Sequence, residues 1–137
     1  MLKDLDQKRI PITLGGKRLY LRYNLNARRY LEDCLPRFEF IAQVDSDSWL
    51  GEETLHLLRA GLMDCYYNEN RKAIEARAWD KIRPSMADLG RQVTEDVLQE
   101  INGAIMQAFV ASLPEAPFVD PAANFPKGGR ENPQTGF

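Results

Sequence analysis

Two adjacent glycines, Gly15 and Gly16, separate two short segments in which apolar and polar residues alternate. This alternation is typical of half-buried strands, and the glycine pair tolerates the positive φ angles of a tight hairpin turn. Pro11 indicates an edge strand, because proline has no N–H to donate to a ladder. The second strand carries a basic and aromatic face made of Arg18, Tyr20 and Arg22. We therefore predict a β-hairpin over residues 10–23.

The segment that follows the hairpin has the apolar spacing of a short helix. Asn24 or Asn26 is suited to cap its start, and Pro36 closes it. Residues 37–47 are ambiguous, since their pattern fits either a third strand or a connecting turn.

Four further helical segments are predicted downstream. The first covers about residues 49–67, and its internal Gly61 is typical of a site where another element approaches closely. Asn68-Glu69-Asn70 interrupts the pattern, after which a charged amphipathic helix runs to Pro84. Ser85 opens a brief helical turn, and Thr94 is suited to cap the last helix.

The composition changes sharply at Pro114. Residues 114–137 contain five of the eight prolines and three of the nine glycines, with few apolar residues to form a core. We predict a disordered tail over 114–137, in which isolated aromatic residues such as Phe118 and Phe125 are suited to dock into a partner. The remaining residues 1–113 form one α+β domain in this prediction, with the hairpin packed on a small bundle of three to five helices.

Length and composition favour a single soluble, cytosolic domain. The chain has 137 residues, of which 44% are hydrophobic and 28% charged. No apolar run is long enough to cross a membrane, and the first residues do not resemble a secretory signal. The one histidine and the two cysteines, which have no CxxC spacing, argue against a zinc site and against a disulfide framework.

The charge is unevenly distributed. Residues 1–30 have a net charge of +6 and residues 31–70 a net charge of −7. This asymmetry suits head-to-tail self-association or a charged partner, although solvated faces explain it more simply. The basic face of the hairpin is suited to phosphate contact and base stacking. An overall net charge of −2 and a pI near 5.5 argue against nucleic acid as the partner.

Motifs of known catalytic chemistry are absent from the sequence. There is no GxSxG elbow, phosphate-binding loop or HExxH pair, and His56 stands beside leucines with no evident nucleophile. The acidic residues around Asp45 and Glu52 lack the spacing of a calcium loop, and helix capping explains them more simply. We predict a protein that is not an enzyme, with no cofactor, metal or small-molecule substrate.

Three segments, taken in order, resemble siphophage and prophage tail assembly chaperones. The hairpin from Ile10 continues into Leu25-Asn-Ala-Arg-Arg-Tyr-Leu-Glu32, as in that family's "I-x-L-G-G-K-x-Y-x-L" and "x-L-N-A-x-x-x-L-E" segments. Leu58-Arg-Ala-Gly-Leu62 matches its "Leu-x-x-Ala-Gly-Leu" segment, and Asp88-Leu-Gly-Arg-Gln-Val93 matches a later turn before a closing amphipathic helix. The resemblance covers roughly residues 8–113 and departs from the family over residues 68–83.

The resemblance implies a non-enzymatic chaperone of the host cytoplasm. It implies binding to the tape measure protein, whose long hydrophobic helices are kept soluble while tail tube protein is recruited, and it implies absence from the finished virion. Two alternatives are a structural tail component, such as a tube or connector subunit, and a small nucleic-acid-binding regulator that uses the basic hairpin face. The candidate partner-binding residues are Arg18, Tyr20, Arg22, Ile101, Ile105, Phe109, Phe118 and Phe125.

Overall fold

The computed structural model describes residues 9–112. Strands β1 (Ile10–Leu14) and β2 (Lys17–Leu21) pair antiparallel, with Ile12 opposite Leu19. Gly15 and Gly16 have φ angles of 59° and 80°, the left-handed backbone that a two-residue hairpin turn needs at both positions. The predicted hairpin is therefore confirmed, although its second strand ends at Leu21 rather than at residue 23.

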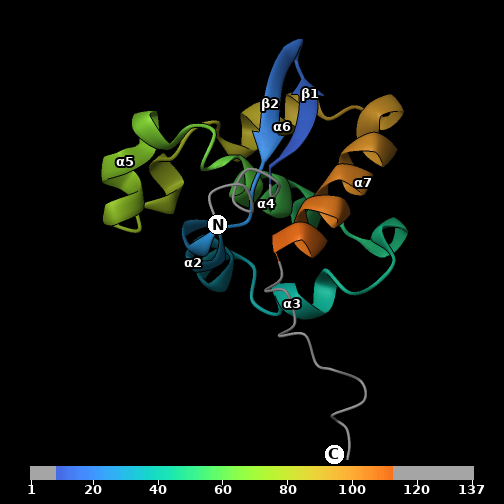
Figure 1. The fold of residues 1–137 in the computed structure, drawn as a ribbon, viewed down its shortest axis with the longest axis horizontal. Helices are drawn as coiled ribbons and strands as arrows, with labels where there is room; N and C mark the ends of the chain where they lie inside the picture. The colour runs from blue at the N-terminus through green and yellow to red at the C-terminus, as the bar shows by residue number, and fades with distance from the viewer. Residues whose placement is uncertain (1–8, 113–137) are drawn as a thin grey trace, which may run out of the picture.

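Helices make up most of the remaining described residues (Figure 1). Within residues 9–112 there are six α-helices, joined by two short 3₁₀ turns at Ser46–Ser48 (η1) and Trp79–Lys81 (η2). The α-helices are α2 (Leu25–Cys34), α3 (Phe38–Ile41), α4 (Gly51–Leu62), α5 (Tyr67–Glu75), α6 (Met86–Gln92) and α7 (Glu95–Ser112). The α+β class and the packing of a hairpin on a helical bundle are confirmed.

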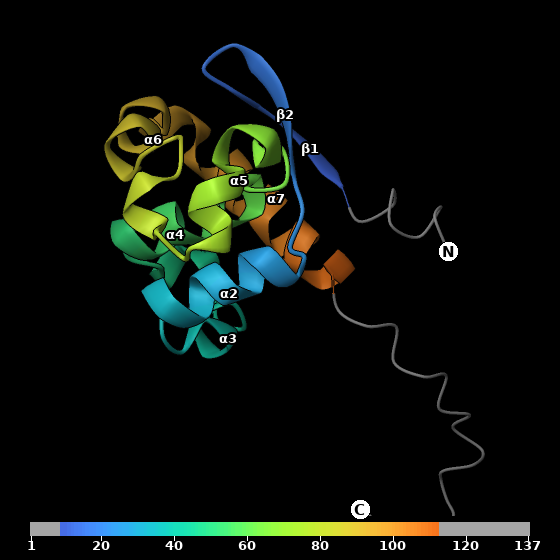
Figure 2. The same cartoon turned by 90° about the vertical axis from the view of Figure 1, so that its left-hand side faces the viewer.

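Helix α4 lies at the centre of the molecule and contacts α2, α6, α7 and strand β2 (Figures 1 and 2). Two leucines of α4 and one side chain from each of α2, α6 and α7 are fully buried. They form the middle of one continuous core: Tyr30, Leu57, Leu58, Leu89 and Ile105. The apolar face of the hairpin packs against this core. The amphipathic helices therefore bury their apolar stripes against α4.

Gly61 permits the close contact between α4 and the hairpin. A Cβ atom at this position would lie 3.0 Å from side-chain atoms of both Leu21 and Tyr23. The backbone N–H of Arg22 also donates to the Gly61 carbonyl at 2.9 Å. The close approach predicted at this mid-helix glycine is confirmed.

The predicted helix starts are confirmed at two positions. The Asn24 side chain accepts a hydrogen bond from the Ala27 N–H at 3.1 Å and caps α2. Ser85 and Asp88 form a capping box at the start of α6. Residues 37–47, which were ambiguous, contain α3 and no strand.

The prediction for residues 63–83 is wrong in detail. Helix α4 ends at Leu62, Asn68-Glu69-Asn70 lies inside α5, and η2 replaces the end of the charged helix predicted to run to Pro84. Asn70 is buried, and its side-chain amide exchanges two hydrogen bonds with the backbone of Arg83, at 2.7 and 2.9 Å. This pairing across 13 residues favours a helix at a position where local propensity indicates a break. The predicted tail over 114–137 lies outside the described residues.

Candidate partner-binding groove

Two of the predicted partner-binding residues lie in the core instead. Ile101 is 2% exposed and Ile105 is 0% exposed. Their stripe on α7 packs against α4 and the hairpin, so it is not an accessible surface in this structure, and the expectation of an exposed stripe is wrong for these two residues. Phe109, further along α7, is only partly buried.

The basic hairpin face is held by an acidic residue to which no sequence pattern pointed. Asp64, just after α4, accepts hydrogen bonds from the Tyr20 hydroxyl at 2.7 Å, from Arg22 at 3.3 Å and from Asn24 at 3.2 Å. Burial and the Asp64 hydrogen bond raise the pKa of Tyr20 to about 12, so its hydroxyl remains a donor at neutral pH. Arg18, by contrast, is exposed on the hairpin. These partners lie 40 to 44 positions before Asp64 in the sequence, and no local pattern signals the pairing.

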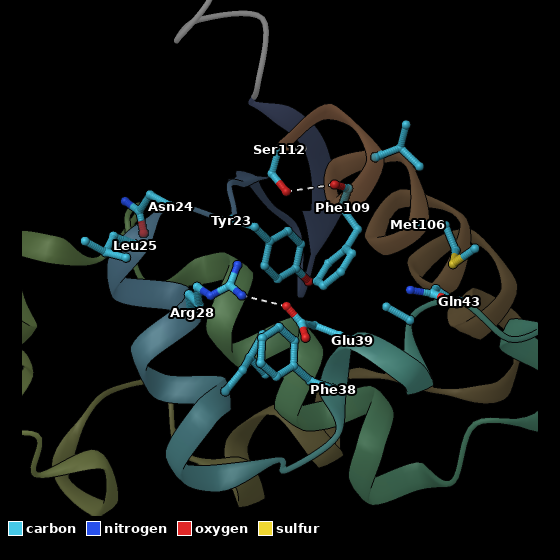
Figure 3. Close-up of a pocket in the computed structure, with 13 residues that line it drawn as sticks. Tyr23, Asn24, Leu25, Arg28, Phe38, Glu39, Gln43, Met106, Phe109 and Ser112 are labelled. Atoms are coloured by element: carbon cyan, nitrogen blue, oxygen red, sulfur yellow. Dashed lines mark hydrogen bonds and ion pairs between the residues drawn. The ribbon is translucent and has the colours of Figure 1, made fainter. Parts of the chain in front are cut away.

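A groove of about 1020 Å³ opens between α2, α3 and the last described turns of α7 (Figure 3). Aromatic rings form its floor. The rings of Tyr23 and Phe109 meet edge to face at a centroid distance of 5.0 Å, and Phe38 meets Phe109 at 6.3 Å. The Tyr23 hydroxyl donates to the Leu57 carbonyl at 2.5 Å, which fixes this ring to the central helix. Burial raises the pKa of Tyr23, so it too remains a neutral donor.

The mouth of the groove exposes aliphatic side chains on two sides. Leu25, at the start of α2, is 72% exposed, and Val110 on α7 is 65% exposed. Four large hydrophobic side chains among the described residues are prominently exposed, and two of the four line this groove. An apolar surface in a concave site is typical of a protein-binding surface.

Charges at the rim are paired with each other. The Arg28 guanidinium donates to the Glu39 carboxylate at 2.6 Å, linking α2 to α3 across the rim (Figure 3). These are the only two charged side chains among the groove-lining residues that the structure describes. The groove therefore has little net charge, and its binding chemistry is mainly apolar.

His56 lies in a separate, largely buried polar cluster. The Tyr30 hydroxyl lies 2.7 Å from His56 Nδ1 and accepts a hydrogen bond from Arg59 at 3.4 Å. With its proton on Nε2, which lies 3.9 Å from a Glu52 carboxylate oxygen, a neutral His56 accepts the Tyr30 proton at Nδ1. Burial raises the pKa of Tyr30 to about 12 and lowers that of His56, which agrees with this arrangement.

Arg59 makes this cluster a connection between elements. Its guanidinium donates to the backbone carbonyls of Ile82 at 2.7 Å and Pro84 at 3.0 Å. The arginine thereby holds the segment before α6 against α4. The hydrogen bonds of this cluster join its members to each other and to the backbone, which is typical of a structural network.

Only part of this site could be predicted from the sequence. Of the predicted residues, the structure places Phe109 in the groove, Arg18, Tyr20 and Arg22 on the hairpin, and Ile101 and Ile105 in the core. Phe118 and Phe125 lie outside the described residues. Leu25 and Val110 were missed, because nothing in the sequence distinguishes an exposed aliphatic residue from a buried one before the packing is known.

The described residues contain no group of three or more His, Cys, Asp or Glu side chains placed to hold a metal ion. No helix in residues 9–112 has both the length and the apolar character that crossing a membrane requires. Neither protein-family models, nor curated proteins, nor solved structures gave a match to this chain.

Proposed function

We propose that this protein is a phage tail assembly chaperone that holds apolar helical segments of the tape measure protein in the groove between α2, α3 and α7. The observation that carries the proposal is the exposure of Leu25 and Val110 at the mouth of an aromatic-floored groove. An amphipathic helix that lays its apolar face into such a groove is a common mode of recognition. The hairpin, the central helix and the closing helix also occur in the order that the family resemblance implies.

The proposal includes a second partner, tail tube protein, and a location in the host cytoplasm. The exposed Arg18 on the hairpin is the proposed contact for tail tube protein, with the chain acting in the host cytoplasm and without catalysis. The hairpin offers less to nucleic acid than its sequence suggested. Tyr20 and Arg22 are both bonded to Asp64, so two of the three residues of that face are already engaged.

The test is co-expression with the tape measure protein of the phage or prophage that encodes this chain. The measured quantity is the fraction of tape measure protein that stays in the supernatant and co-purifies with the tagged chain. We expect Val110→Gln, alone and with Leu25→Gln, to lower this fraction several-fold. The matched control is Leu50→Gln, because Leu50 is also 65% exposed but does not line the groove.

An equal loss of co-purifying tape measure protein in the groove variants and in the control would contradict specific binding in the groove. Full retention in all variants would exclude the groove as the binding surface. Mass spectrometry of purified virions separates the proposal from the structural alternative, since a chaperone is absent from virions and a tube or connector subunit is present.

A further inference from the structure

The segment that follows α7 starts at the groove. Ser112 is the last described residue of the chain and itself lines the groove (Figure 3). The sequence continues Leu113-Pro114-Glu115-Ala116-Pro117-Phe118-Val119. Two prolines three positions apart, followed by an aromatic and an aliphatic residue, therefore begin two positions after a residue that lines an aromatic-floored site.

The prolines favour one backbone conformation for this segment. Each proline fixes its own φ near −65°, and the residue before a proline is kept out of the helical region. Leu113 and Ala116 both precede prolines, so residues 113–117 are biased towards an extended polyproline II backbone. Such a segment loses little conformational entropy when it binds. Proline-rich segments with this P-x-x-P spacing dock into aromatic-lined grooves for that reason.

The groove complements such a segment in three ways. Its floor includes the rings of Tyr23, Phe38 and Phe109, an aromatic lining of the kind that proline-rich segments bind. The pairing of Arg28 with Glu39 leaves no net charge to oppose an apolar ligand. The amide of Gln43 at the rim brings a donor and an acceptor for the backbone groups that a polyproline II segment leaves without partners (Figure 3).

The distance to be covered is short. Phe118 is the sixth residue after Ser112, and an extended chain over six residues spans up to about 20 Å. We propose that Leu113–Val119 occupies the groove of its own chain, with Phe118 as the anchor that covers the exposed Leu25 and Val110. This inference goes beyond the proposed function, because the segment occupies the groove in the absence of any partner and has to be displaced by one that uses the same surface.

The test is methionine-methyl NMR on the full chain labelled with ¹³C at its methionine methyl groups. The chain has four methionines, of which Met106 lines the groove and Met63 is buried in the core. We expect Phe118→Ser to shift the Met106 methyl signal by more than its linewidth and to leave the Met63 signal in place. Met106→Leu assigns the signal, and Phe125→Ser is the matched control that should leave Met106 unshifted. Both serine variants lie outside the described domain, so loss of folding does not confuse the result.

The outcomes separate the possible occupants. A Phe118→Ser shift that is the same at low and high protein concentration supports docking within the chain. A shift that disappears on dilution, or that is reversed by adding unlabelled wild-type chain, assigns the segment to a second copy and overturns the proposal. No shift, or an equal shift from Phe125→Ser, also overturns it. None of these samples contains a phage partner, so a negative result leaves the proposed chaperone function untouched.

Discussion

At the scale of single residues, buried and partly buried polar side chains in this protein act as connectors. Arg59, Asp64 and Asn70 each bind groups that are distant in sequence, and each does so through two or more hydrogen bonds. A buried polar group that lost its partners would carry an uncompensated desolvation cost of about 1–3 kcal/mol. These residues therefore help to select one packing of the short helices.

Gly61 and Gly103 give a paired prediction. Both are helix-interior glycines, but a Cβ at Gly61 would lie 3.0 Å from Leu21 and Tyr23, whereas a Cβ at Gly103 meets nothing within 4 Å. The affected atoms are side-chain ends, yet the Tyr23 hydroxyl is held by Leu57 and Leu21 is fully buried. We expect Gly61→Ala to lower the free energy of unfolding by about 1 kcal/mol and Gly103→Ala to raise it by about 0.5–1 kcal/mol. Urea unfolding measures both, and stabilisation by both variants would contradict the close contact.

His56 gives a prediction of pH dependence. Burial, as the main cause, lowers the pKa of His56 below its usual value of 6.5, so the unfolded chain binds this proton more readily than the folded one. The titration of His56 therefore leaves the free energy of unfolding unchanged well above pH 6.5. It lowers this free energy as the pH falls from 6.5 towards the pKa of His56 in the folded chain. The loss is at most about 1.4 kcal/mol for each pH unit.

His56→Gln tests this assignment, because it removes the titration while keeping an acceptor for the Tyr30 hydroxyl. The unfolding free energy of the wild type, measured by urea titration between pH 7.5 and 5, should fall more steeply than that of the variant. Parallel pH profiles for the two chains would show that His56 titrates alike in the folded and unfolded states.

At the scale of elements, Asp64 joins three pieces of the fold. It follows the end of α4 and binds the second strand of the hairpin and the residue that caps α2. The arrangement holds the hairpin in its position on the helices, where Gly61 allows the close contact. Helix α2, which supplies one wall of the groove, is positioned through the same carboxylate.

Asp64→Ala should therefore loosen the hairpin and the start of α2 together. We expect a loss of about 2 kcal/mol in unfolding free energy, since three donors lose their acceptor. Native-state hydrogen exchange should be faster in Lys17–Leu21 and in the first turn of α2. Asp80→Ala, which removes an exposed carboxylate, serves as the control and should change stability by less than about 0.5 kcal/mol. Unchanged exchange of the hairpin in Asp64→Ala would contradict the role of Asp64.

Local patterns account for the elements that the sequence predicted correctly. The hairpin follows from alternation around Gly15-Gly16, and the starts of α2 and α6 follow from Asn24 and Ser85, all of which act over a few residues. The path through residues 63–83 could not be predicted in the same way, because it depends on the pairing of Asn70 with Arg83. The groove was also beyond sequence reasoning, since its walls come from three separate helices.

At the scale of the whole molecule, the described domain presents an apolar groove formed by α2, α3 and the last turns of α7. These parts lie at the end opposite the hairpin turn (Figures 1 and 2). The interior stripe of α7 is used by the domain itself, so partner binding depends on the groove and its rim. A single surface that accepts either the chain's own Leu113–Val119 or a partner helix would link partner capture to release of that segment.

The most direct test of the central claim is a hydrogen-exchange footprint of the full chain with and without the tape measure protein. The account predicts that added protection is concentrated in residues 24–43 and in the last described turns of α7, the segments that line the groove. Protection confined to the hairpin turn or to α5, with none in the groove-lining segments, would contradict the groove as the partner-binding surface.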